Sequence, residues 1–453
     1  MKKRVINMMC SYSQFEKKGK ATLKKGIGRG WEKLRRDPRN LFYLISAAGI
    51  LVYIVLSFRY GGRLFAWMIQ ENAPEIRFID YFSHLDGISD PATLYQHVSW
   101  DADGSYAAVF PPLAYCMYFL LYRLTAMHEG MPAGTMVEEI PGALTLLTIY
   151  LIFNAVLFYL AIEITGRKDR KKDLTIFSLL MLSAIFAGSG YLLANSTMLV
   201  VSLLMAGLQL KDSTSAFWRE TGLVLLAVSV AMKIYPAVFG LIFLKERKYK
   251  ELIRLCLYSL ILFFVPFVFF GGVTGFRAWW SNLNGPLQSA SFYGRPQFLK
   301  GVFYTLIMKW TGRGEMALSS ILTVAVCLVW VWLAWRSKSS SRSLFFLVCI
   351  MVFYPSSAYR YTLAYFSIPL VMILKEEPVE KAPESFTRII SILYGLLFTI
   401  PVWWLLVMPM DLRFTIHTLT SVEIYLYLVT YVLIGVMTGL ELTTSRWAAK
   451  RCV

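Results

Sequence analysis

Long apolar stretches, separated by short polar segments, run through the chain after residue 40. A helix of about 20 apolar residues spans the hydrocarbon core of a bilayer and satisfies its own backbone hydrogen bonds there. The pattern therefore predicts transmembrane helices near residues 41–58, 144–165, 174–188, 192–210, 251–270, 316–335, 343–355, 361–374, 388–408 and 422–442. With the two halves of an interrupted stretch at 221–244, we expect an all-α polytopic membrane protein of about twelve transmembrane helices.

The interrupted stretch contains the sequence Lys233-Ile-Tyr-Pro236. Proline removes an internal hydrogen bond and disfavours helix at the preceding residue. Charged segments typical of cytoplasmic loops flank the stretch on both sides. Both of its ends are therefore expected in the cytoplasm, whereas a single crossing would place one end outside. We expect two short helices that meet at this break.

Residues 108–125 are apolar but include the pair Pro111-Pro112. If they crossed the membrane, the basic segment 166–172 would lie outside, although basic loops are typically cytoplasmic. We therefore expect a juxtamembrane helix on the outer face here, and a second surface segment at 301–311.

The composition excludes an ordinary soluble domain, because 57% of the residues are hydrophobic and only 16% are charged. The net charge of +18 is concentrated in short basic segments beside apolar runs, and residues 1–40 carry 13 Lys and Arg against 3 acids. This distribution predicts a protein of the cytoplasmic membrane with both termini in the cytoplasm. It favours contact with membrane lipids and not with nucleic acid.

Three parts are expected from this organisation. Residues 1–40 form a basic cytoplasmic tail, residues 41–375 a transmembrane module with outer loops at 59–143 and 271–315, and residues 376–453 two further transmembrane helices with the cytoplasmic C-terminus. The cysteines and histidines show no metal-type spacing. We expect no cofactor, and a divalent metal is not excluded.

Two candidate reactive groups lie in the predicted outer half. Asp80 is in the first outer loop, where a partly desolvated carboxylate suits a general base, and His84 would share its face if the segment is helical. An ordinary wetted loop acid is the simpler alternative. Lys233 follows too few apolar residues to reach the far interface, and a buried cation at a helix break usually marks a functional site. Snorkelling of its side chain toward the headgroups is the alternative.

Two further polar clusters are candidates for ligand binding. The turn that ends in Arg360-Tyr361 carries a guanidinium suited to phosphate. The alternative is that its arginine and aromatic side chains anchor the turn at the membrane interface. The second outer loop carries Asn282, Gln288 and Arg295, whose side chains suit hydroxyl-rich or phosphate ligands, although any polar loop would look similar.

The order of these features resembles the GT-C superfamily of membrane glycosyltransferases. It is most similar to bacterial polyprenyl-phosphate-mannose-dependent α-1,2-mannosyltransferases over about residues 41–375. The residues that carry the resemblance are Asp80-Tyr81, Phe110-Pro111-Pro112-Leu113, Asn195, Ala231-Met-Lys-Ile-Tyr-Pro236 and Tyr354-Pro-Ser-Ser-Ala-Tyr-Arg360-Tyr361. The chain departs from the family pattern in having Leu-Leu-Ala before Asn195, where Gly-Gln-x is frequent, and in lacking a histidine in the last turn.

The resemblance implies transfer of a mannose-like hexose from a polyprenyl-phosphate sugar donor to a glycan or glycolipid acceptor at the outer face, with inversion. Asp80 would be the general base. Lys233, Tyr235, Arg360 and Tyr361 would lie near the donor phosphate. Weaker candidates for substrate contact are Tyr81, His84, Pro111, Pro112, Asn195, Gln288 and Arg295.

Two other functions fit the same composition. A lipid-linked polysaccharide polymerase or ligase would bring several outer arginines to one pocket. A flippase or transporter of lipid-linked solutes would show paired broken helices in corresponding halves of the chain, whereas the sequence predicts one break.

Overall fold

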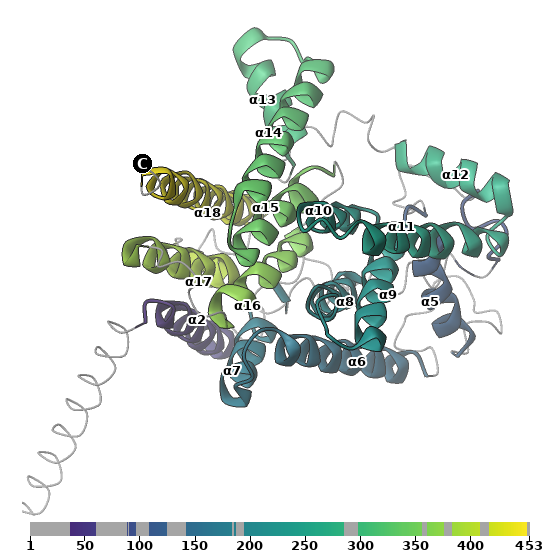
Figure 1. The fold of residues 1–453 in the computed structure, drawn as a ribbon, viewed down its shortest axis with the longest axis horizontal. Coiled ribbons are helices and arrows are strands. Elements are labelled where there is room, and N and C mark those ends of the chain that lie inside the picture. The colour runs from purple at the N-terminus through teal and green to yellow at the C-terminus, as the bar shows by residue number, and fades with distance from the viewer. Residues whose placement is uncertain are drawn as a thin grey trace, which may run out of the picture.

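The computed structural model describes residues 37–59, 88, 90–96, 108–124, 142–183, 185–186, 194–284, 298–355, 360–375, 383–407 and 416–450. Within these ranges the secondary structure is helical, with no strand, which confirms the all-α class (Figure 1). The tail 1–36 lies outside the described residues.

Four helical segments in the described part are long and apolar enough to cross a membrane. They lie in α6 (Ala143–Ile164), in α11 (Tyr249–Phe264) with its continuation η6 (Val265–Val268), in α14 (Met316–Arg336) and in α18 (Ile416–Lys450). Shorter apolar segments include Asn40–Leu56 of α2 (Asn40–Arg59), α8 (Thr197–Leu210) and α15 (Ser340–Phe353). A membrane bundle is therefore supported, and the number of twelve crossings stays a prediction.

The predicted break lies at the expected residues. Helix α9 (Ala216–Met232) ends before Lys233, whose backbone is extended, and the chain continues as η5 (Tyr235–Phe239) and α10 (Gly240–Lys245). Lys211, before α9, pairs with Glu246, after α10, at an Nζ–Oε2 distance of 2.8 Å. The two short helices therefore form a hairpin, with Lys233 at its tip.

Helices α2, α17 (Glu384–Val407) and α18 form one group, in which α17 packs against both neighbours (Figure 1). Gly49 of α2 faces Thr399 of α17, where an added Cβ would lie 2.7 Å from the threonine Cβ. Gly395 of α17 faces Ile45 of α2 in the same way, and a Cβ added to it would lie 2.9 Å from the isoleucine Cβ. Small residues allow this close approach of membrane helices.

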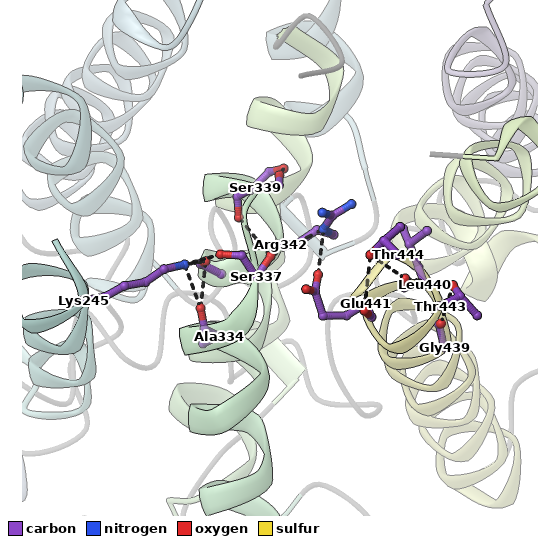
Figure 2. Close-up of polar contacts among 12 residues, drawn as sticks. Lys245, Ala334, Ser337, Ser339, Arg342, Gly439, Leu440, Glu441, Thr443 and Thr444 are labelled. Atoms are coloured by element: carbon purple, nitrogen blue, oxygen red, sulfur yellow. Dashed lines mark hydrogen bonds and ion pairs between the residues drawn. The ribbon is translucent and has the colours of Figure 1, made fainter. Parts of the chain in front are cut away.

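Opposite the hairpin tip, ion pairs and hydrogen bonds join the helix ends; we call this region the charged end. Lys245 donates to the carbonyls of Ala334 and Ser337 at the C-terminus of α14, and Arg342 of α15 pairs with Glu441 of α18 at 2.9 Å (Figure 2). The negative end of a helix dipole favours such a cation. These contacts fix α10, α14, α15 and α18 to one another.

The charged end also contains a fully buried ion pair. Lys375 ends α16 (Ser367–Lys375), which follows η9 (Arg360–Phe366), and its ammonium lies 2.6 Å from Asp173 of α7 (Arg170–Met181). Helix α7 begins inside the basic segment, earlier than the predicted residue 174, because the side chain of Asp169 caps it by accepting from the Lys172 amide.

A separate aromatic cluster lies beyond the far end of α11. It joins residues 90–96, α5 (Pro112–Arg123) and α12 (Gly272–Asn284) (Figure 1). Helix α5 lies within the apolar segment 108–125, and α13 (Leu299–Thr311) within the predicted surface segment. That these two segments lie at the outer membrane surface stays a prediction.

Candidate functional site

Lys233 is the centre of a buried polar site. Its side chain is 3% exposed, and its ammonium donates to the amide oxygen of Asn195 at 2.9 Å and to the hydroxyl of Thr197 at 2.9 Å. The extended backbone at Lys233, with φ −149° and ψ 114°, follows directly from the end of α9. The break thus turns the lysine toward the start of α8.

Asn195 and Thr197 form the N-terminus of α8. The Asn195 amide oxygen accepts from the Thr197 backbone at 2.8 Å and from the Thr197 hydroxyl at 2.6 Å, as in the turns that asparagine forms with the residue two positions later. A helix N-terminus carries partial positive charge and attracts anions. An ammonium and a helix N-terminus therefore reinforce one another as an anion site.

Two aromatic rings flank the ammonium. The Lys233 Nζ lies 4.9 Å from the ring centre of Phe110 and 5.0 Å from that of Tyr361. Cation–π contacts stabilise a desolvated ammonium. Segments that are far apart in the sequence, around residues 110, 195, 233 and 361, therefore meet at one point.

Tyr235 lies beside this site and pairs with Tyr365. Their ring centres are 5.8 Å apart at 84°, and the Tyr365 hydroxyl donates to that of Tyr235 at 3.4 Å. Tyr365 is fully buried. This contact ties the residue after the break to η9, the element that also carries Tyr361.

Pro111 and Pro112 are buried and set the chain direction behind Phe110. Pro111 precedes α5 with φ −58° and ψ 154°, and Pro112 is the first helical residue. Proline suits this position because its fixed φ is helical. The N–H group that it lacks would have no partner within the helix at the first helical residue. The two prolines therefore orient the Phe110 segment.

Several expected site residues are not tested. Asp80, Tyr81, His84, Gln288 and Arg295 lie outside the described residues. Arg360 begins η9, and its side chain is likewise outside the description.

Asn282, which the sequence suggested as a ligand-binding amide, holds the backbone through its side-chain nitrogen, and a role in ligand binding stays a prediction. Its side chain is 3% exposed and donates to two backbone carbonyls, those of Tyr95 and Ala108. A buried amide that holds the backbone and one that binds ligand have the same signature in sequence.

Sequence reasoning missed Thr197 and Tyr365. A threonine two residues after an asparagine at a helix start was the available signal for Thr197. In the described part of the chain, no group of three or more His, Cys, Asp and Glu side chains is arranged to hold a metal.

Comparison with known families bears on this site. The sequence model of glycosyltransferase family 87 matches residues 135–357, slightly less than half of the chain. The matched range contains Asn195, Lys233 and Tyr235, and it ends before Tyr361. No curated protein matches the chain. The match and the helical membrane bundle together support a membrane glycosyltransferase of the GT-C superfamily.

Proposed function

We propose that the protein transfers a mannose-like hexose from a polyprenyl-phosphate donor to a glycan or glycolipid acceptor at the outer face of the cytoplasmic membrane, with inversion. The acceptor hydroxyl attacks the anomeric carbon, and the bond from that carbon to the phosphate oxygen breaks. Polyprenyl phosphate leaves with the electron pair of that bond, and the acceptor proton passes to Asp80.

The observation that carries this proposal is the surrounding of Lys233. An amide oxygen, a hydroxyl and two rings hold its ammonium at the N-terminus of α8. A leaving phosphate develops negative charge in the transition state, and a preorganised cation at a helix N-terminus stabilises it. Lys233 therefore takes the role of the phosphate-binding cation, with Arg360 as a second cation on the same turn as Tyr361.

One contact in the first outer loop, residues 59–143, supports the role proposed for Asp80. Phe110 belongs to this loop, and its ring packs against the Lys233 ammonium. We place Asp80 of the same loop at this site, where its carboxylate and the ammonium would act on one bound sugar.

The test uses the purified protein in liposomes with a polyprenyl-phosphate sugar. Lys233→Met should raise the KM for the donor about 10- to 100-fold, because a charge-assisted hydrogen bond contributes about 1.5–3 kcal/mol. Lys250→Met, which removes an exposed lysine at the start of α11, is the matched control and should behave as wild type. An unchanged donor KM in Lys233→Met would remove the lysine from the phosphate site.

A second variant tests the general base. Asp80→Asn should lower kcat by about 10²- to 10⁴-fold, the range that positioned proton transfer contributes, while the protein still inserts into the membrane and melts normally. Full activity of this variant would exclude Asp80 from the mechanism.

A further inference from the structure

We propose that helix α12, through Trp279 and Asn282, positions the ring of Phe110 at the donor phosphate site. These are positioning residues, since they act through Phe110 and do not touch the substrate. The inference rests on the proposed function of Lys233, and it assigns to the second outer loop a role in donor binding.

Three consecutive backbone carbonyls before α5 accept hydrogen bonds from three different side chains. Asn282 Nδ2 donates to the carbonyl of Ala108 at 3.2 Å, and Trp279 Nε1 donates to that of Val109 at 3.1 Å. The Tyr95 hydroxyl donates to the carbonyl of Phe110 at 2.8 Å. Each residue of the segment 108–110 is therefore held from outside it.

The donors themselves are fixed. Trp279 is 2% exposed, Asn282 3% and Tyr95 1%, so an unmade hydrogen bond would leave a buried polar group unsatisfied. Asn282 also donates to the carbonyl of Tyr95 at 3.0 Å, which joins two of the donors. The indole of Trp279 packs against Phe263, with ring centres 5.3 Å apart. We call these three donors the α12 clamp, because two of them lie on α12 and the third is tied to it.

The α12 clamp determines where the Phe110 ring lies. The clamp holds the chain before Pro111, and the two prolines fix the direction of the chain after Phe110. The ring that results lies 4.9 Å from the Lys233 ammonium. If the clamp loosens, the ring can leave the ammonium, and the geometry of the phosphate site changes.

The helix offers a matched control for each residue. Trp280 follows Trp279 but is 55% exposed. Asn284 lies two residues after Asn282, and its amide donates to the Trp280 carbonyl of its own helix at 2.7 Å. Comparing these pairs separates an effect of the clamp from a general effect on α12.

The experiment measures donor kinetics of the full-length protein in liposomes with a polyprenyl-phosphate sugar. Trp279→Phe should raise the donor KM about fivefold, as expected for one buried hydrogen bond, and Asn282→Ala, which removes two, should raise it at least as much; kcat should be nearly unchanged in both. Trp280→Phe and Asn284→Ala should leave the donor KM at the wild-type value. A purely structural role for Trp279 would lower the amount of active protein, and hence the apparent kcat, without moving the KM.

A double variant tests whether the clamp acts through Phe110. With Phe110→Leu already in place, adding Trp279→Phe should raise the donor KM no further, because coupled residues are non-additive. The inference is overturned if the increases in donor KM caused by Phe110→Leu and Trp279→Phe multiply in the double variant. It is also overturned if Trp279→Phe and Trp280→Phe have the same donor KM. Should Trp279→Phe fail to fold, Tyr95→Phe replaces it. This substitution removes only the hydroxyl that donates a hydrogen bond to the carbonyl of Phe110.

The outcomes separate this inference from the proposed function. If Lys233→Met raises the donor KM and the clamp variants do not, only the role of α12 is wrong. If wild-type protein does not use a polyprenyl-phosphate sugar, or Lys233→Met leaves the donor KM unchanged, both proposals fail.

Discussion

Two buried lysines, Lys233 and Lys375, contact different kinds of groups. The ammonium of Lys375 lies 2.6 Å from the Asp173 carboxylate and 2.6 Å from the carbonyl of Ile162. The ammonium of Lys233 donates to an amide oxygen and a hydroxyl and lies between two aromatic rings. Asp173 cancels the charge of Lys375, whereas the groups around Lys233 include an amide oxygen, a hydroxyl and two aromatic rings at the N-terminus of α8, a setting that suits a phosphate.

The difference extends to the two ends of the bundle. At the charged end, Lys211 pairs with Asp212 and Glu246, Arg342 pairs with Glu441, and Lys245 caps α14. These cations join helices and have a structural role. Burial alone therefore does not separate a structural cation from a candidate ligand-binding one, since Lys233 and Lys375 are both buried.

The largest expected effect concerns the structural pair. Asp173→Asn should destabilise the protein by about 3–5 kcal/mol, because it leaves the buried Lys375 ammonium without its counter-ion. The measurement is the melting temperature in detergent, together with the donor KM of the folded fraction, which should not change. A normal melting temperature would show that this pair does not hold the helices together.

A smaller effect is expected at the other lysine. Thr197→Val removes the hydroxyl that accepts from Lys233 while keeping the shape of the side chain, so the donor KM should rise about fivefold with little change in melting temperature. Thr221→Val is the control, since its hydroxyl is exposed and donates to the Phe217 carbonyl of its own helix. Equal donor KM values in the two variants would contradict a positioning role for Thr197.

The smallest effect depends on pH. Burial raises the pKa of Asp212, but hydrogen bonds from Lys211 and Lys248 outweigh it, and the pKa lies below its ordinary value of 3.8. A carboxyl with a depressed pKa stabilises the fold above its unfolded pKa, and this stabilisation is lost as the pH falls through the folded pKa. Melting temperatures of wild type and Asp212→Asn should therefore differ above about pH 5 and converge only as the pH falls below 3.8, through the folded pKa. A constant difference at all pH values would point to packing and not to charge.

The local features of the fold could be predicted because each depends on neighbouring residues. Apolar run length predicted the helices, and the proline at 236 with the charges on both flanks predicted the hairpin that the Lys211–Glu246 pair confirms. The order of short motifs nominated Asn195, Lys233, Tyr235 and Tyr361, which the structure brings together. The roles of Asp80 and Arg360 stay predictions, because their side chains lie outside the described residues.

The sequence by itself determined the class of protein, the position of the break and most of the residues around Lys233. Only the tertiary structure decided that Phe110 packs on the ammonium, that Thr197 and Tyr365 complete the site, and that Asn282 holds the backbone of Ala108. The physical reason is that helix formation and membrane insertion follow from local composition. A hydrogen bond between residues 108 and 282 depends on how α12 packs against the start of α5, and no local pattern contains that information.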